Sequence, residues 1–95
     1  MVTLEIVKPY LRILGSQDDA TITLMMEAAI QKTTSRMRKP ANYNDVGPVS
    51  KAFIMAVCIQ TAFYYANRGD ASVMDMDPPG YKSLIALEKP GASYV

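Results

Sequence analysis

The sequence contains no histidine and only one cysteine among its 95 residues. Without histidine, the chain lacks the side chain that serves most often as a general base in enzymes and as a metal ligand. A lone cysteine excludes a disulfide framework, and Cys58 lies between Val57 and Ile59, where an apolar setting leaves a thiol inert. We therefore expect a protein that is not an enzyme and that holds no cofactor and no metal ion.

Glycine-rich segments and long apolar runs are also missing. The five glycines stand singly, which excludes a phosphate-binding loop. The longest apolar run, residues 52–59, is far shorter than the roughly 20 residues that span a bilayer. No basic segment precedes an apolar one at the N-terminus, so no signal peptide is indicated. We expect a soluble intracellular protein with no membrane partner.

An excess of charge of one sign is absent as well. Ten basic and nine acidic residues leave a net charge of +1, which is not typical of a tight binder of duplex DNA. The densest basic group is Lys32, Arg36, Arg38 and Lys39. These cations could contact phosphates, but we favour the interpretation that they complement the dipole at a helix C-terminus. Aspartates 70, 75 and 77 could hold a hard cation, but the spacing lacks the glycine and later glutamate of an EF-hand, so a solvated acidic loop is favoured.

The feature that dominates the chain is the apolar segment from Pro48 to Arg68. It is too long for a single strand and rich in good helix formers, so we predict a helix that begins at Pro48 and is followed by Gly69 as a C-cap. Ser50, Thr61 and Arg68 share one side of this helix, with Gln60 and Asn67 beside them. Nearly all the rest is apolar. Such a helix must be covered on most sides, in part by partner subunits.

Spacing and capping residues predict three further helices. From Ile22 to Met37, apolar residues recur at spacings of three and four residues, which predicts an amphipathic helix. Pro40 ends this helix. Pro9 is expected to kink the first helix or to delay its start. The predicted helices cover 4–12, 18–38, 48–68 and 80–88, and a flexible tail covers 90–95. Because residues 39–47 form a short connection, we predict one all-α domain: a small helical bundle of two long antiparallel helices with a short N-terminal and a short C-terminal helix.

Several segments, taken in order, resemble the head–tail connector proteins of long-tailed bacteriophages, also called adaptor, head-completion or DNA-packaging proteins. The chain opens with Leu4-Glu5-x-Val7-Lys8-x-Tyr10-Leu11-Arg12-Ile13, followed by a polar turn with acidic residues at 16–19. Later come Glu27-Ala28-Ala29, then x-Tyr64-Tyr65-x-Asn67-Arg68, and finally Pro79-Gly80-Tyr81-x-x-Leu84-Ile85. The resemblance covers essentially the whole chain.

This resemblance implies a structural protein of the virion, located at the head–tail junction and assembled in the host bacterial cytoplasm. Family members form a homo-oligomeric ring, expected to be a dodecamer, that docks on the portal protein after DNA packaging. The ring extends the channel, lets double-stranded DNA pass without specific recognition, and receives the tail-side neck (stopper) or tail component. A near-neutral protein suits such a channel.

Site residues follow from this implied role. A ring needs two different surfaces on each subunit. The expected subunit contacts are Tyr64, Tyr65, Arg68 and Met25. The expected portal or neck contacts are Met74, Met76, Tyr81, Leu84 and Tyr94. The expected contacts with channel DNA or phosphate are Lys32, Arg36, Arg38 and Lys39.

An alternative interpretation of the composition is a small dimeric helical module with a regulatory or nucleic-acid-associated role. The lack of a basic recognition helix argues against it. The mass of the assembly separates the two hypotheses, because a dimer and a many-membered ring differ several-fold.

Overall fold

The computed structural model describes residues 1–70, 72–73 and 76–88. The regular elements are α1 (Leu4–Leu11), α2 (Asp19–Arg36), η1 (Tyr43–Asp45), α3 (Lys51–Ala66) and α4 (Tyr81–Glu88). All regular structure within the described residues is therefore helical, and the predicted all-α class is confirmed. The expected flexible tail, 90–95, lies outside the described residues.

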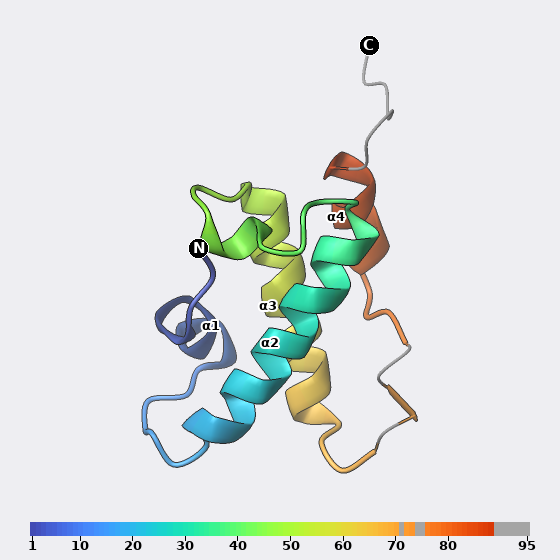
Figure 1. Cartoon of the computed structure of the whole chain (residues 1–95). Coiled ribbons are helices and arrows are strands. Elements are labelled where there is room, and N and C mark those ends of the chain that lie inside the picture. Colours follow the sequence, from blue (N-terminus) through green and yellow to red (C-terminus); the bar gives the residue numbers. More distant parts are fainter. Residues whose placement is uncertain (71, 74–75, 89–95) are drawn as a thin grey trace.

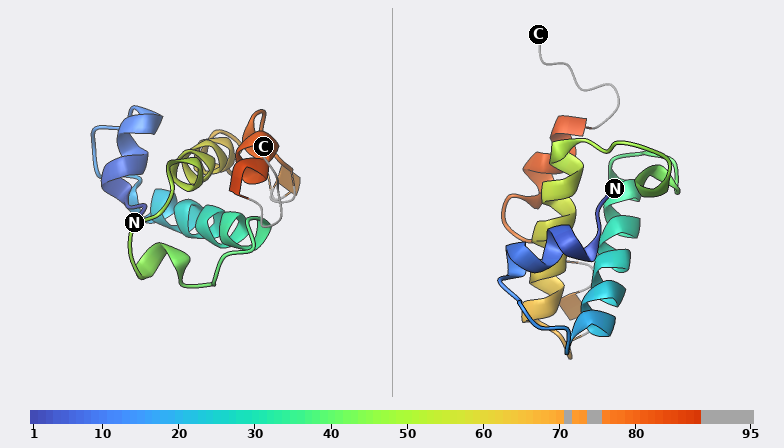
Figure 2. Two further views of the ribbon diagram at one scale, coloured as in Figure 1. Left: turned by 90° about the horizontal axis from the view of Figure 1, so that it is seen from above. Right: turned by 90° about the vertical axis from the view of Figure 1, so that its left-hand side faces the viewer.

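The two long helices, α2 and α3, run antiparallel and form the centre of the molecule (Figure 1). α4 packs along α3, whereas α1 contacts both long helices on another side (Figure 2). The short connection between α2 and α3 contains η1. The predicted helical hairpin is thus present, and the two short helices cover different parts of it.

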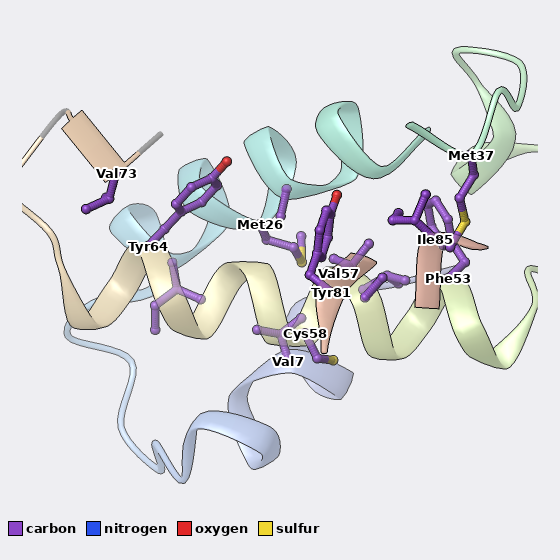
Figure 3. Packing of buried hydrophobic residues seen from close by; sticks show 14 residues of the cluster. Val7, Met26, Met37, Phe53, Val57, Cys58, Tyr64, Val73, Tyr81 and Ile85 are labelled. Atoms are coloured by element: carbon purple, nitrogen blue, oxygen red, sulfur yellow. The ribbon is translucent and has the colours of Figure 1, made fainter. Parts of the chain in front are cut away.

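The core lies between α2, α3 and α4 (Figure 3). Met26 of α2, Phe53 and Val57 of α3, and Ile85 of α4 are buried there. Val7 of α1 packs near Cys58, which is buried with a raised pKa because burial disfavours the thiolate. The thiol is accordingly a core side chain.

The apolar helix is shorter than predicted at both ends. Ser50 is its N-cap, and its side chain accepts a hydrogen bond of 3.1 Å from the Phe53 N–H. α3 therefore begins at Lys51, not at Pro48, because the serine hydroxyl satisfies an unpaired helical N–H. At the other end Asn67 takes the C-cap position, and Gly69, with φ of 96°, comes two residues later.

Pro9 lies inside α1 without delaying its start at Leu4. A proline has no N–H for the carbonyl of Glu5, four residues earlier. Both residues are exposed, so water can supply the missing donor. α1 ends at Leu11, and its C-cap, Arg12, has a left-handed backbone with φ of 60°. The exposed position explains why the proline is tolerated.

Candidate functional site

Three charged side chains meet between α2 and the loop that precedes α4. Lys32 Nζ lies 2.8 Å from Asp77 Oδ1, and Arg36 Nη1 lies 3.1 Å from Asp77 Oδ2. The Lys32 and Asp77 side chains are 12% and 11% exposed, whereas Arg36 is 43% exposed. We call these residues, together with Gln60, the Lys32 cluster. It ties the loop to the last turns of α2.

The ammonium of Lys32 is held by contacts within the subunit. Besides the ion pair, it donates to Gln60 Oε1 and to the Met76 carbonyl, each at 2.9 Å, and it lies 5.0 Å from the centre of the Tyr81 ring. Two of its three N–H donors therefore serve hydrogen bonds within the subunit, and the charge of the ammonium pairs with Asp77. Burial raises the pKa of Asp77, but hydrogen bonds from Lys32 and Arg36 outweigh it and hold that pKa below its ordinary value.

Sequence reasoning assigned Lys32 and Arg36 to phosphate contacts, and in the structure both side chains pair with Asp77. Arg38 and Lys39 lie just beyond the end of α2. Arg38 is exposed, with φ of 56°, and Lys39 Nζ lies 5.2 Å from the centre of the Tyr43 ring. Two of the four cations thus pair with Asp77, and the other two lie just beyond the end of α2, where Lys39 packs over the Tyr43 ring.

The expected partner contacts divide similarly. Tyr81 is fully buried and shares a 2.8 Å hydrogen bond with Thr33, and its pKa is raised by burial. Its side chain is therefore part of the core of the subunit. Met76 is 52% exposed and Leu84 is half-buried, so both have surface. Met74 and Tyr94 lie outside the described residues.

The expected subunit contacts gather at the far end of α3, except for Met25, which is half-buried on α2. The hydroxyl of Tyr65 donates to Asp18 at 2.5 Å, which raises the pKa of this tyrosine. The guanidinium of Arg68 lies 4.3 Å from the centre of the Tyr65 ring and is exposed. Tyr64, in contrast, is buried in the core. Tyr65 and Arg68 thus have exposed surface, whereas Tyr64 lies in the core beneath them.

A groove that sequence reasoning did not anticipate lies beside α2. Its wall is the N-terminal segment, which is fixed because the Val2 N–H donates to Asn44 Oδ1 at 2.7 Å and Asn44 Nδ2 donates to the Val2 carbonyl at 3.2 Å. The cavity measures about 1070 Å³. We call it the N-terminal groove. Its lining residues are 1–5, 23, 26, 27, 30, 31, 34, 35, 39, 41, 44 and 45. No local signal distinguished Asn44 from an ordinary turn residue.

The outward side of α3 is also unexpected. Gln60 and Thr61, on the polar side of the predicted helix, are fully buried, whereas Met55 and Ala66 are exposed. Met55, Ile59, Ala62 and Ala66 follow one another at spacings of three and four, and we call them the outer stripe. The apolar helix therefore directs its amides and hydroxyls inward and leaves an apolar strip outward.

These features define a small helical protein whose distinctive surfaces are a groove, an apolar stripe and an ion-paired loop. Among the described residues, no three histidine, cysteine, aspartate or glutamate side chains gather as a metal site. No helix in this part of the chain is long and apolar enough to cross a bilayer. The arrangement is suited to contact with other proteins.

A family model, that of the phage gp6-like head–tail connector protein, matches residues 1–87, so the chain belongs to this family. No match was found among curated proteins or among solved structures. Family membership makes the chain a structural phage protein of the head–tail junction and a component of the virion, which interacts with other head and tail proteins. The resemblance noted in the sequence is thereby confirmed.

Proposed function

We propose that the chain forms a ring at the head–tail interface, docks on the portal protein after DNA packaging, extends the DNA channel and receives the tail-side neck component. The observation that carries this proposal is the family match over residues 1–87, which includes α1, α2, α3 and nearly all of α4. A dodecamer is the proposed ring. Membership in the connector family favours this role over the dimeric regulatory module.

The distribution of charge supports passage of DNA through the ring. The net charge is +1, and Asp77 neutralises part of the charge of Lys32 and Arg36. Phosphate contacts by lysine and arginine supply most non-specific affinity for DNA, so a channel wall with few available cations lets the duplex slide. We assign the remaining phosphate contacts to Arg38 and Lys39.

We assign partner contacts to side chains that are exposed or half-buried. Met76 and Leu84 stand on the α4 side and are the proposed portal or neck contacts within the described residues. Met74 and Tyr94 keep this assignment from the sequence alone. Tyr65, Arg68 and Met25 are the proposed subunit contacts, whereas Tyr64 and Tyr81 contribute by holding the surface residues in place.

Docking can be tested with the purified portal protein of the same phage. The wild-type chain should cosediment with portal at a fixed ratio. Met76→Asp should weaken this association by about tenfold or more, because it places an unpaired charge in a contact that excludes water. Leu14→Asp is the matched control, since Leu14 is almost fully exposed in the loop between α1 and α2.

Either of two results would contradict the proposal. The first is a wild-type chain that never cosediments with portal at any concentration. The second is tight binding to a short DNA duplex with a steep salt dependence, which a channel protein should lack. The second result would favour the nucleic-acid-associated module.

A further inference from the structure

The outer stripe of α3 is apolar and is only partly covered by its own subunit. Met55 is 51% exposed, Ala66 is exposed, and Ile59 and Ala62 are half-buried. None of these four residues belongs to the core cluster or to the side chains packed against it. They lie on the side of α3 opposite Phe53, Val57 and Tyr64, which face the interior (Figure 3). The outer stripe therefore points away from α2.

The N-terminal groove has the complementary shape. Val2, Leu4, Met26 and Ile30 give it an apolar floor, because all four are buried or half-buried. The N-terminal segment and η1 flank α2 on this side, away from α4 (Figure 2). The two hydrogen bonds between Val2 and Asn44 hold one wall in position, so the groove exists before a partner arrives. A concave apolar floor with a polar rim is the surface that receives one face of an amphipathic helix.

The two surfaces agree in length. From Met55 to Ala66 the outer stripe covers about 17 Å of helix at 1.5 Å per residue. The residues of α2 that line the groove run from Thr23 to Ser35, which corresponds to about 18 Å by the same rise. A groove of this length accommodates the whole stripe.

The charges of the two surfaces are also complementary. Lys51, which is exposed at the start of α3, is the only charged residue between Pro48 and Asn67. The groove has three exposed carboxylates among its lining residues, at Glu5, Glu27 and Asp45. Two cationic groups also line it, the Lys39 side chain and the N-terminal ammonium of Met1, so the carboxylates are in excess by one. A stripe with one positive end thus meets a rim with an excess of negative charge, which favours approach and fixes orientation.

We infer that the N-terminal groove of one subunit receives the outer stripe of a second copy of this chain. This contact rests on the proposed ring and adds two surfaces, the groove and the stripe, to the subunit contacts proposed above at Tyr65, Arg68 and Met25. The groove lies beside α2 and the stripe faces away from α2, so each copy uses two different surfaces. A contact of this heterologous kind leaves one groove and one stripe unused in every pair, so further copies can add, and a ring forms when the rotation between neighbours closes.

Paired cysteines test the contact. Met55→Cys places a thiol on the outer stripe, and Gln31→Cys places one on the exposed rim of the groove. A short bis-maleimide should link the two single variants to each other when they are mixed, but should not link either variant to itself. Cys58 is buried with a raised pKa, so the reagent should spare it in the wild-type chain. Leu14→Cys mixed with Met55→Cys is the control and should remain unlinked.

A chain that carries both Met55→Cys and Gln31→Cys should give a ladder of linked species in denaturing gels. The same samples are measured by light scattering, which separates the two proposals. A ring with cross-links supports both, and linked pairs without a ring support the contact but contradict the ring. A ring without cross-links overturns the contact alone. A monomer or dimer that shows no cross-links at any concentration, with or without added portal protein, overturns both.

A charge variant checks the result without a reagent. Met55→Glu should weaken self-association by about tenfold or more, because the carboxylate would be buried against an acidic rim. Leu14→Glu should leave self-association unchanged. Circular dichroism and thermal unfolding verify that both variants fold, since both positions are exposed. Equal self-association of the Met55→Glu variant and the wild type would overturn the inference.

Discussion

Replacing Asp77 by asparagine should destabilise the protein by about 2 kcal/mol at neutral pH. Breaking a buried ion pair by removing one partner costs roughly 3–5 kcal/mol, whereas an exposed pair contributes roughly 0.2–1 kcal/mol. The Lys32–Asp77 pair is largely covered, but it lies near the surface of a small protein, and Lys32 keeps two oxygen acceptors after the substitution. The expected cost therefore lies between the two ranges.

The measurement is urea unfolding of both proteins at equal concentration. Asp19→Asn is the matched control, because Lys8 Nζ lies 2.7 Å from Asp19 Oδ1 while the Asp19 side chain is 37% exposed. This control should cost less than about 1 kcal/mol. A loss of 2 kcal/mol corresponds to a fall in Tm of roughly 8–16 °C for a domain of this size.

The pH dependence gives an independent check. The pKa of Asp77 is lower in the folded protein than its ordinary value of about 3.9. A lowered folded-state pKa means that the carboxylate contributes fully above the unfolded-state pKa, and that this contribution is lost as the pH falls through the folded-state pKa. The difference between wild type and the Asp77→Asn variant should be constant from about pH 5 to 8 and should shrink below about pH 4. Equal costs for Asp77→Asn and Asp19→Asn, or a difference that persists in acid, would refute this reasoning.

Two further substitutions test the packing behind the surfaces. Tyr81→Phe removes the buried hydrogen bond to Thr33 and should cost about 1–2 kcal/mol in urea unfolding, and an unchanged stability would show that Thr33 finds another partner. Asn44→Ala removes both hydrogen bonds to the Val2 backbone and should cost about 1–3 kcal/mol. It should also speed hydrogen exchange of the Val2 amide, and unchanged exchange would show that Asn44 does not hold this wall of the N-terminal groove.

Much of the fold could be predicted because apolar spacing identifies a helix face directly. The recurrence from Ile22 to Met37 marked the buried side of α2, and the short following connection indicated a hairpin. The start of α3 was misplaced because Pro48 and Ser50 are both good helix-start residues. The structure shows that the side chain of Ser50 makes the capping bond.

The candidate site was harder to predict because its contacts join residues far apart in the chain. Arg36 at the end of α2 had a sufficient local explanation in the helix dipole, yet its carboxylate partner, Asp77, is 41 positions away. Asp18 occupies the N-cap position of α2, but its side chain makes no cap bond and accepts from Tyr65, 47 positions away. Local sequence patterns cannot identify such distant partners, because an aspartate can equally well cap a helix or accept a hydrogen bond from a residue far away in the chain.

The outward face of α3 shows a related limit. Gln60 was placed on the polar side of a helix, and polar sides usually face water. In the structure Gln60 accepts a hydrogen bond from Lys32, so its burial depends on a side chain of another helix. Because the polar side of α3 faces the interior, Met55 on the opposite side is left on the surface. Only the three-dimensional packing of the helices shows this.

The most direct test of the account is light scattering coupled to size exclusion, over a range of concentrations and with portal protein added. The account predicts either one large homogeneous species, many times the 10.5 kDa mass of the chain, or a monomer that assembles on portal at a fixed ratio. A stable dimer that ignores both concentration and portal would contradict it.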